Sequence, residues 1–357
     1  YQQLKQHLVQ YRVIQDAGGL PRISDAVSGL KLNESNPGVP SLRKYLYLTG
    51  DLSNADTTEA IFDKAVAQAV GNFQMRCGYE KTDELDDKTL LKLNVPVENI
   101  IMQIMVNMER MRWFSKPDSA SDFLLVNIPD YQLRAFENNK LQWEMDVVVG
   151  TTANRTTVFK GMLSQVVLNP YWNVPQSIID NEMLEHLKDN PGKYTASQNL
   201  EVLVKNKPVK ASSVDWSDPE EVQSARIRQL PGDANSLGRY KFLFPNSFSI
   251  YLHDSPAKHL FDKDKRTFSH GCIRVAEPEK LANYLLRDIK EWSPEKVKKS
   301  VGKDEEIFIN LKKPLPVYIV YFTAWVDDKG KLNLRDDPYE HDKKLEREIY
   351  VKAGKAS

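Results

Sequence analysis

The chain has 357 residues, carries 49 Lys and Arg against 49 Asp and Glu, and is 41% hydrophobic. This length exceeds what one hydrophobic core usually serves, so two or three domains are expected. The balanced charge gives no indication of nucleic acid or an anionic membrane as the main partner. The sequence contains no run of 18 apolar residues, so no transmembrane helix is expected.

The first third of the chain is predicted to be helical. Residues 1–36 form an N-terminal helical scaffold segment that loosens from Gly18 onward, and residues 37–95 then repeat apolar side chains at helical spacing. Within residues 37–95, one set of positions resembles the small peptidoglycan-binding domain of many cell-wall enzymes. These positions are Ala69, Val70, Phe73, Gln74, Gly78, Asp86 or Asp87, Thr89 and Leu93. A generic three-helix bundle is the alternative, because helical periodicity alone is common.

Residues 96–120 are expected to be a connecting helix and a linker. The helix runs from Asn99 to Trp113, and its methionines favour packing over a binding surface. The linker is the polar stretch at residues 116–122.

After the linker the hydrophobic period changes to two, which predicts a β-rich domain over residues 121–335. The stretches FLLVNI, YQLRAFE and LQWEMDVVVG read as a β-meander, and KLNLR near residue 335 is expected to finish the sheet. Residues 176–238 change character, with one helix and polar loops, and are interpreted as an insertion. Residues 336–357 are expected to form a C-terminal helical tail. The fold class is therefore α+β, with a small helical domain ahead of a β-rich domain.

The heptapeptide SHGCIRV contains one of the two cysteines of the chain. Cys77 ends an amphipathic helix and fits a core role, whereas Cys272 has polar and small neighbours. A thiol becomes a nucleophile when a nearby base or positive charge favours the thiolate, and histidine is the usual base. His270 lies two residues away, and His253 lies where an apolar strand opens into a loop. These residues predict nucleophilic catalysis by Cys272.

Three other interpretations of these residues stay open. His253, His270 and Cys272 have the side-chain types that bind zinc, yet no Cys-x-x-Cys or His-Glu-x-x-His framework accompanies them. A structural role for a buried cysteine with hydrogen-bonded histidines is the second. A Cys77–Cys272 disulfide is the third, and it would silence the proposed nucleophile.

His253, a spacer of fifteen residues and then Ser269-His270-Gly271-Cys272 resemble the motif of the L,D-transpeptidase catalytic domain. The aromatic turn at residues 169–175, the insertion and the N-terminal domain together resemble the large, lidded branch of that family. Arg274 departs from the commonest pattern, in which asparagine follows the apolar residue, so the role of that asparagine cannot be transferred to it.

The resemblance implies a mechanism without metal or other cofactor. Cys272 would attack the peptide bond before D-alanine in a tetrapeptide stem, and His253 would accept the thiol proton and then protonate the leaving D-alanine. The backbone carbonyl of Asp254 would hold the imidazole, and the N–H groups of Gly271 and Cys272 would form an oxyanion hole. Substrate-binding roles are expected at Ser269, His270, Arg274, Tyr251, Tyr171 and Trp172.

The expected function is an exported, periplasmic or cell-envelope enzyme that forms 3→3 peptidoglycan cross-links between donor and acceptor stem peptides through a thioester. The resemblance also implies acylation of Cys272 by carbapenem-type β-lactams. Residues 176–238 would then act as a lid that excludes water. An L,D-carboxypeptidase or endopeptidase with the same nucleophile is one rival, and a catalytically silent peptidoglycan-binding scaffold is another. The intact pair of Cys272 and His253 argues against the scaffold.

Overall fold

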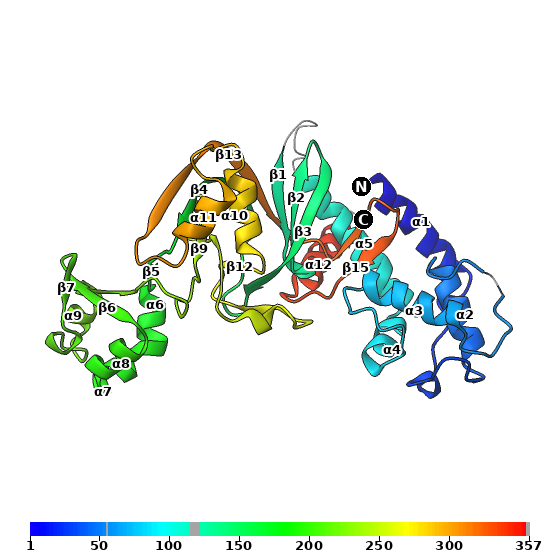
Figure 1. The fold of residues 1–357 in the computed structure, drawn as a ribbon. Helices are drawn as coiled ribbons and strands as arrows, with labels where there is room; N and C mark the ends of the chain where they lie inside the picture. The colour runs from blue at the N-terminus through cyan, green and yellow to red at the C-terminus, as the bar shows by residue number, and fades with distance from the viewer. Residues whose placement is uncertain (55, 115–121, 355–357) are drawn as a thin grey trace. The chain divides into compact units, whose positions relative to one another are not determined.

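A computed structural model describes residues 1–54, 56–114 and 122–354, and its side chains through residue 349. The described chain divides into two compact units, coloured in chain order in Figure 1. The first contains residues 1–114, 127–130 and 321–354, and the second contains residues 122–126 and 131–320. No helix in the described part of the chain is long and apolar enough to cross a membrane. Most of the predicted linker at residues 116–122 lies outside the described residues.

The first unit is mainly helical, as predicted. Its helices are α1 (Gln2–Asp16), α2 (Val39–Leu48), α3 (Lys64–Arg76), α4 (Asp87–Leu93), α5 (Val97–Trp113) and α12 (His341–Gly354). Asp63 and Asp86 begin α3 and α4 as N-caps, because each carboxylate accepts a backbone N–H of the first turn.

Two hydrophobic clusters hold this unit together. One contains Phe73 and Cys77 and gathers buried residues from Ile23 to Leu93. The other joins α1 and α5. The predicted division at residue 36 therefore does not match the packing, because Ile23 and Val27 already belong to the core of the segment that follows. Only Gln2–Asp16 of the first 36 residues is α-helical.

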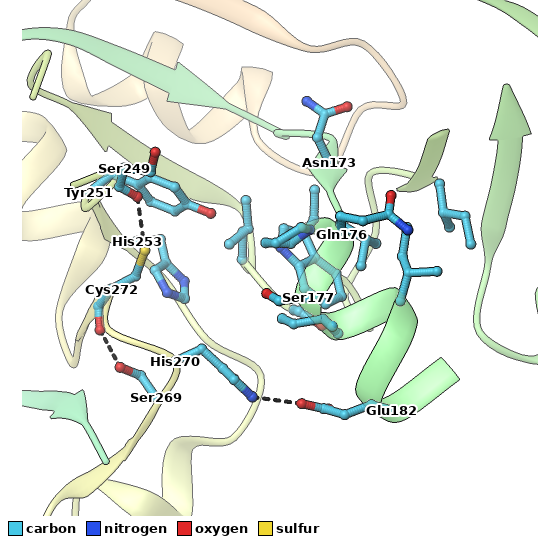
Figure 2. A pocket seen from close by; sticks show the side chains of 18 of the residues that line it. Asn173, Gln176, Ser177, Glu182, Ser249, Tyr251, His253, Ser269, His270 and Cys272 are labelled. Atoms are coloured by element: carbon cyan, nitrogen blue, oxygen red, sulfur yellow. Dashed lines mark hydrogen bonds and ion pairs between the residues drawn. The ribbon is translucent and has the colours of Figure 1, made fainter. Parts of the chain in front are cut away.

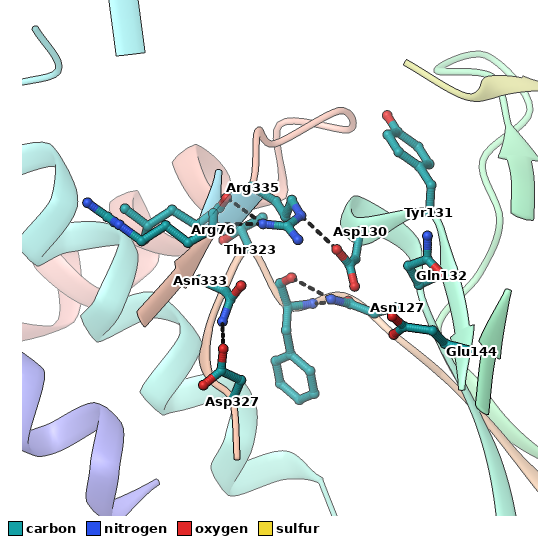
Figure 3. A network of polar contacts seen from close by, with 12 residues as sticks. Arg76, Asn127, Asp130, Tyr131, Gln132, Glu144, Thr323, Asp327, Asn333 and Arg335 are labelled. Carbon is teal, nitrogen blue, oxygen red and sulfur yellow. Dashed lines mark hydrogen bonds and ion pairs between the residues drawn. The ribbon is translucent and has the colours of Figure 1, made fainter. Parts of the chain in front are cut away.

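The expectation that residues near 335 finish the large sheet is wrong. Strands β14 (Ala324–Val326) and β15 (Leu332–Leu334) pair only with each other. They do so because Ala324, Leu332 and Leu334 bury their side chains against α1 and α5. Figure 3 shows Arg335 beside this hairpin, where its Nε donates to buried Asp130 at 2.6 Å and its Nη1 donates to the Arg76 carbonyl at 2.8 Å.

The second unit is built on a nine-stranded sheet. Its first strands match the predicted meander: β1 (Phe123–Asn127), β2 (Gln132–Glu137), β3 (Lys140–Gly150) and β4 (Phe159–Leu168). The others are β9 (Tyr240–Leu243), β10 (Leu252–His253), β11 (Thr267–Ser269), β12 (Ile273–Val275) and β13 (Ile307–Val320). The strand order is β11-β3-β12-β10-β9-β4-β13-β1-β2, and β2 also pairs with β3, so the sheet closes on itself. Helices α10 (Pro278–Leu286) and α11 (Pro294–Ser300) follow β12 (Figure 1).

The segment predicted to be an insertion forms a subdomain with its own core. Strands β5 (Trp172–Asn173), β6 (Leu200–Val204), β7 (Lys207–Val209) and β8 (Ala225–Gln229) form a separate four-stranded sheet in the order β5-β8-β6-β7. Its helices are α6 (Gln176–Ile178), a π-helical turn (Ile179–Met183), α7 (Leu184–Asp189), α8 (Pro191–Ser197) and α9 (Pro219–Ser224). The loops expected after residue 189 are therefore largely strands and short helices. They pack around buried residues such as Leu187, Trp216 and Ile227.

Candidate active site

Three adjacent strands bring the predicted base and nucleophile together. His253 on β10 is in register with Lys241 on β9 and with Arg274 on β12. Paired residues on neighbouring strands project to the same face of a sheet, so these three side chains form a row. Cys272 directly precedes β12 and lies two residues before Arg274, and both residues line the same cavity.

The loop that carries Cys272 is held by hydrogen bonds between its backbone groups and the side chains of Ser269 and Thr156. Gly271 adopts φ of +111°, a conformation that favours glycine. Its N–H donates to Ser269 Oγ at 3.1 Å, and its carbonyl accepts from Thr156 Oγ1 at 2.8 Å. The Ser269 hydroxyl in turn donates to the Cys272 carbonyl. Ser269 is 2% exposed, and its hydroxyl is engaged by these two backbone groups of the loop.

His253 is buried, and the Asp254 carbonyl oxygen lies 2.5 Å from its Nδ1. A carbonyl can only accept, so Nδ1 carries the hydrogen and Nε2 keeps its lone pair. Burial lowers the pKa of His253 to about 3, with further lowering by the charges of Arg274 and Lys241. The imidazole is therefore neutral near pH 7 and able to accept a proton at Nε2.

The Asp254 carboxylate has a structural task. It accepts from the backbone N–H of Arg239 at 2.9 Å and of Ser255 at 2.7 Å, and it pairs with Lys258 at 2.6 Å. A side chain at Gly238 would meet this carboxylate, since an added Cβ would lie 2.3 Å from Oδ2. Asp254 thus contacts the imidazole through its carbonyl, which is the contact that the family resemblance implied.

The Cys272 thiol donates to the Ser249 carbonyl at 3.6 Å. Ser249 has φ of +56°, an uncommon conformation for serine, and the Asn246 side chain bridges the backbone of Phe244 and Ile250 around it. Burial raises the pKa of Cys272, and hydrogen bonding by Tyr251 opposes this change. The resting group is therefore a thiol held by a carbonyl, and among the described contacts no hydrogen bond joins it to His253.

Cys272 and His253 line a cavity of about 980 Å³ (Figure 2). Among the predicted substrate-binding residues, Tyr251, Trp172, Ser269, His270 and Arg274 also line it. Tyr171 is not among the described lining residues; its N–H donates to Glu306, and its ring stacks under Arg228. The prediction for Tyr171 thus has no geometric support.

The inserted subdomain forms one wall of this cavity. Trp172, Val174, Gln176, Ile178 and Ile227 face the strands that carry the histidine and the cysteine. At the rim, Glu182 of the π-helical turn lies 2.7 Å from Nε2 of His270 (Figure 2). His270 therefore has its Nε2 engaged with the insertion, whereas among the described contacts the Nε2 of His253 has no such partner.

Sequence reasoning missed Lys241, Ser249 and Glu182. Lys241 is the charged residue of the short strand YKFL, which marks it as unusual in the sequence but does not place it beside His253. Ser249 and Glu182 gave no local signal, because their roles depend on backbone conformation and on a contact across 88 positions of the chain.

Two of the other interpretations concern a Cys77–Cys272 disulfide and a zinc site at Cys272. Both Cys77 and Cys272 are free thiols. Within the described residues, no group of three or more His, Cys, Asp or Glu side chains is arranged to hold a metal ion.

The YkuD family, the L,D-transpeptidase catalytic domain, matches residues 121–319. The chain belongs to this L,D-transpeptidase family. A Haemophilus influenzae protein named "Putative L,D-transpeptidase" is 34% identical over 248 residues, which are 69% of this chain and 49% of that protein. The chain thus spans about half the length of this relative.

Two solved structures are among those to which this chain is similar. An L,D-transpeptidase from Mycobacterium smegmatis is 13% identical, with 56% of this chain and 59% of that chain covered and a TM-score of 0.29. The L,D-transpeptidase LdtMt1 in complex with imipenem is 11% identical, with 56% and 59% covered and a TM-score of 0.25.

Proposed function

We propose that this L,D-transpeptidase family member is a cysteine acyltransferase that forms 3→3 cross-links in peptidoglycan. The observation that carries the proposal is the pairing of a free thiol with a buried, neutral imidazole in one cavity. A tetrapeptide stem is the donor, D-alanine is the leaving group, and the side-chain amine of a second stem is the acceptor.

In the acylation step, Nε2 of His253 accepts the proton of the Cys272 thiol while sulfur attacks the carbonyl carbon that precedes D-alanine. The tetrahedral intermediate collapses when His253 returns the proton to the D-alanine nitrogen, and the C–N bond breaks. The thioester remains, and free D-alanine leaves. In the second step, the acceptor amine attacks the thioester carbonyl carbon and loses a proton to His253. The C–S bond then breaks, the cross-linked product leaves, and the Cys272 sulfur takes the proton back from His253.

Starting this reaction requires two rearrangements of the resting contacts. The thiol must exchange its hydrogen bond to Ser249 for one to His253. The oxyanion then needs N–H donors. The Cys272 N–H has no hydrogen-bond partner among the described backbone contacts, whereas the Gly271 N–H is already donated to Ser269. The Cys272 N–H is therefore the donor that is available at once, and Gly271 would join it by releasing Ser269.

Hydrolysis of the same thioester by water would make the protein an L,D-carboxypeptidase or endopeptidase. The inserted subdomain favours transfer, because it walls the cavity and limits access of water to the thioester. Its contact with the catalytic loop at His270 supports a lid role for residues 176–238.

The setting of this activity would be the cell envelope outside the cytoplasm. Residues 37–95 would bind peptidoglycan and bring the catalytic unit to its substrate. Gln74, one of the positions that resemble the peptidoglycan-binding domain, is buried and donates hydrogen bonds to Thr82 and Thr89. Carbapenem-type β-lactams would acylate Cys272, a proposal supported by the imipenem complex of a family member.

The proposed function is tested by intact-protein mass spectrometry after mixing with a tetrapeptide stem. We expect a mass increase equal to the stem minus D-alanine, absent in Cys272→Ala and retained in Cys77→Ala. Product analysis with and without an acceptor stem then separates cross-linking from hydrolysis. Unmodified protein together with unchanged stem would contradict the proposal.

A further inference from the structure

The cavity holds two cations that form no ion pair with a carboxylate of the described residues. The side chain of Lys241 forms no ion pair or hydrogen bond among the described contacts, and its Nζ lies 4.2 Å from the centre of the Tyr251 ring. Arg274 has a buried Nε with no hydrogen-bond partner among the described residues. Both side chains are only partly exposed and line the cavity beside Cys272.

Such cations are costly unless an anion neutralises them, because burial removes part of their hydration. Burial lowers the pKa of Lys241 and of Arg274. The carboxylates nearby are already engaged. Glu182, on the cavity rim, contacts His270, and Glu306, whose charge acts on Lys241, accepts the N–H of Tyr171 and forms no ion pair with the lysine. Lys241 and Arg274 are therefore available to bind an anionic group of a ligand that enters the cavity.

The register of the strands fixes where that anion would lie. Lys241 and Arg274 flank His253 on either side, on β9 and β12. In the proposed reaction, His253 protonates the nitrogen of the leaving residue. When that residue is the last of the stem, its carboxylate carbon is about 2.5 Å from this nitrogen, because only the Cα lies between them. A free carboxylate must therefore lie next to His253.

We propose that Lys241 and Arg274 bind the terminal carboxylate of the donor stem and so select stems whose leaving residue carries a free carboxylate. This assignment rests on the proposed function and adds its substrate specificity. A stem that ends in an amide, or that continues beyond the leaving residue, would place a neutral group between the two cations. Their charges would then stay unpaired, which disfavours binding and acylation.

The experiment compares two tetrapeptide stems that differ only at the terminus, D-alanine and D-alaninamide. The second-order rate of acyl-enzyme formation is measured by mass spectrometry for the wild type, Lys241→Gln, Lys241→Arg and Arg274→Gln. We expect the wild type to prefer the free carboxylate by about 10- to 100-fold, the range for a charge-assisted contact. Lys241→Gln and Arg274→Gln should each lose at least about 10-fold on the acid and little on the amide, while Lys241→Arg retains most of the preference.

Arg226 provides a matched control, since it also lines the cavity but lies on β8 of the insertion, away from the row with His253. Arg226→Gln should keep the wild-type preference. Equal acylation of both stems by the wild type, or an equal loss on both stems in Lys241→Gln with an unchanged unfolding temperature, would overturn this assignment alone. Absence of an acyl-enzyme with either stem would overturn the proposed function and this assignment with it.

Discussion

The Nδ1 atom of His253 lies 2.5 Å from the carbonyl oxygen of Asp254, the next residue along the chain. This contact selects the tautomer in which Nε2 can accept a proton, and it needs no carboxylate. The aspartate side chain is used instead to tie the backbone at Arg239 and Ser255. The catalytic histidine is thus oriented by the main chain, which a substitution at Asp254 would disturb only indirectly.

The pH dependence of acylation should reveal the unusual environment of His253. Burial, Arg274 and Lys241 lower its pKa to about 3, so the imidazole stays neutral well below its ordinary value near 6.5. We expect the rate of acyl-enzyme formation to show no histidine-dependent loss between pH 7 and about 5. The measurement is the acylation rate of the folded protein against pH. A half-loss of rate near pH 6.5 would contradict the low pKa.

The same pKa difference affects stability. The folded-state pKa is below the unfolded-state value, so the unfolded chain binds an extra proton as the pH falls below about 6.5. The contribution of neutral His253 is complete above that pH and is lost as the pH falls toward about 3. Denaturant unfolding of His253→Gln should therefore show a shallower loss of stability between pH 6.5 and 5 than the wild type. Parallel curves would argue against a buried, neutral imidazole.

Much of the catalytic sheet could be predicted from the sequence, because β1 is a short apolar run, β2 alternates buried and less buried residues, and short turns join β1 to β2 and β2 to β3. The two central residues of the candidate site, His253 and Cys272, could also be predicted from the sequence, since they lie in short motifs. The role of Lys241 could not be predicted, because its position beside His253 depends on the register of β9 and β10. The hairpin at residues 324–334 has the same period as the large sheet, and only its packing on helices separates the two.

The insertion shows the other limit of sequence reasoning. Strands β6 and β8 have only five residues each and lie between polar segments. The alternation of apolar and polar residues in them is therefore too short to predict a strand. Their pairing buries Val202 and Ile227, which are far apart in sequence. The insertion, whose second part was predicted to be loops, thus has a hydrophobic core of its own and forms one wall of the cavity.

The Ser269 hydroxyl should be required for the shape of the catalytic loop. Ser269→Ala removes the acceptor of the Gly271 N–H and the donor to the Cys272 carbonyl, and each lost hydrogen bond costs about 1 kcal/mol. We expect acyl-enzyme formation to fall by about 10-fold or more, because misplaced reacting groups slow the chemistry steeply. Ser269→Thr keeps the oxygen and should retain more activity than Ser269→Ala. Wild-type rates in Ser269→Ala would show that the hydroxyl is dispensable.

Gly238 should tolerate no side chain. It has φ of +60°, and an added Cβ would lie 2.3 Å from the Asp254 carboxylate that ties the backbone beside His253. Gly238→Ala should lower the free energy of unfolding by about 1 kcal/mol or more and reduce acylation as well. Gly232→Ala is the control, because its nearest neighbouring atom is 3.7 Å away and its φ is not positive. Equal behaviour of the two variants in thermal unfolding would contradict the prediction.

The contact between Glu182 and His270 should hold the insertion over the thioester. Both side chains are about half exposed, so the contact is worth at most about 1 kcal/mol, or a factor of about 5 in the closed population. Glu182→Ala should therefore raise the share of hydrolysed over cross-linked product by up to about fivefold, because a more open cavity admits water. Glu185→Ala is the matched control, since Glu185 contacts Lys188 and does not line the cavity. Labelling of Cys272 by a small thiol reagent should be at least as fast in Glu182→Ala as in the wild type. If product ratio and labelling rate are the same in both variants, the insertion is held by other contacts.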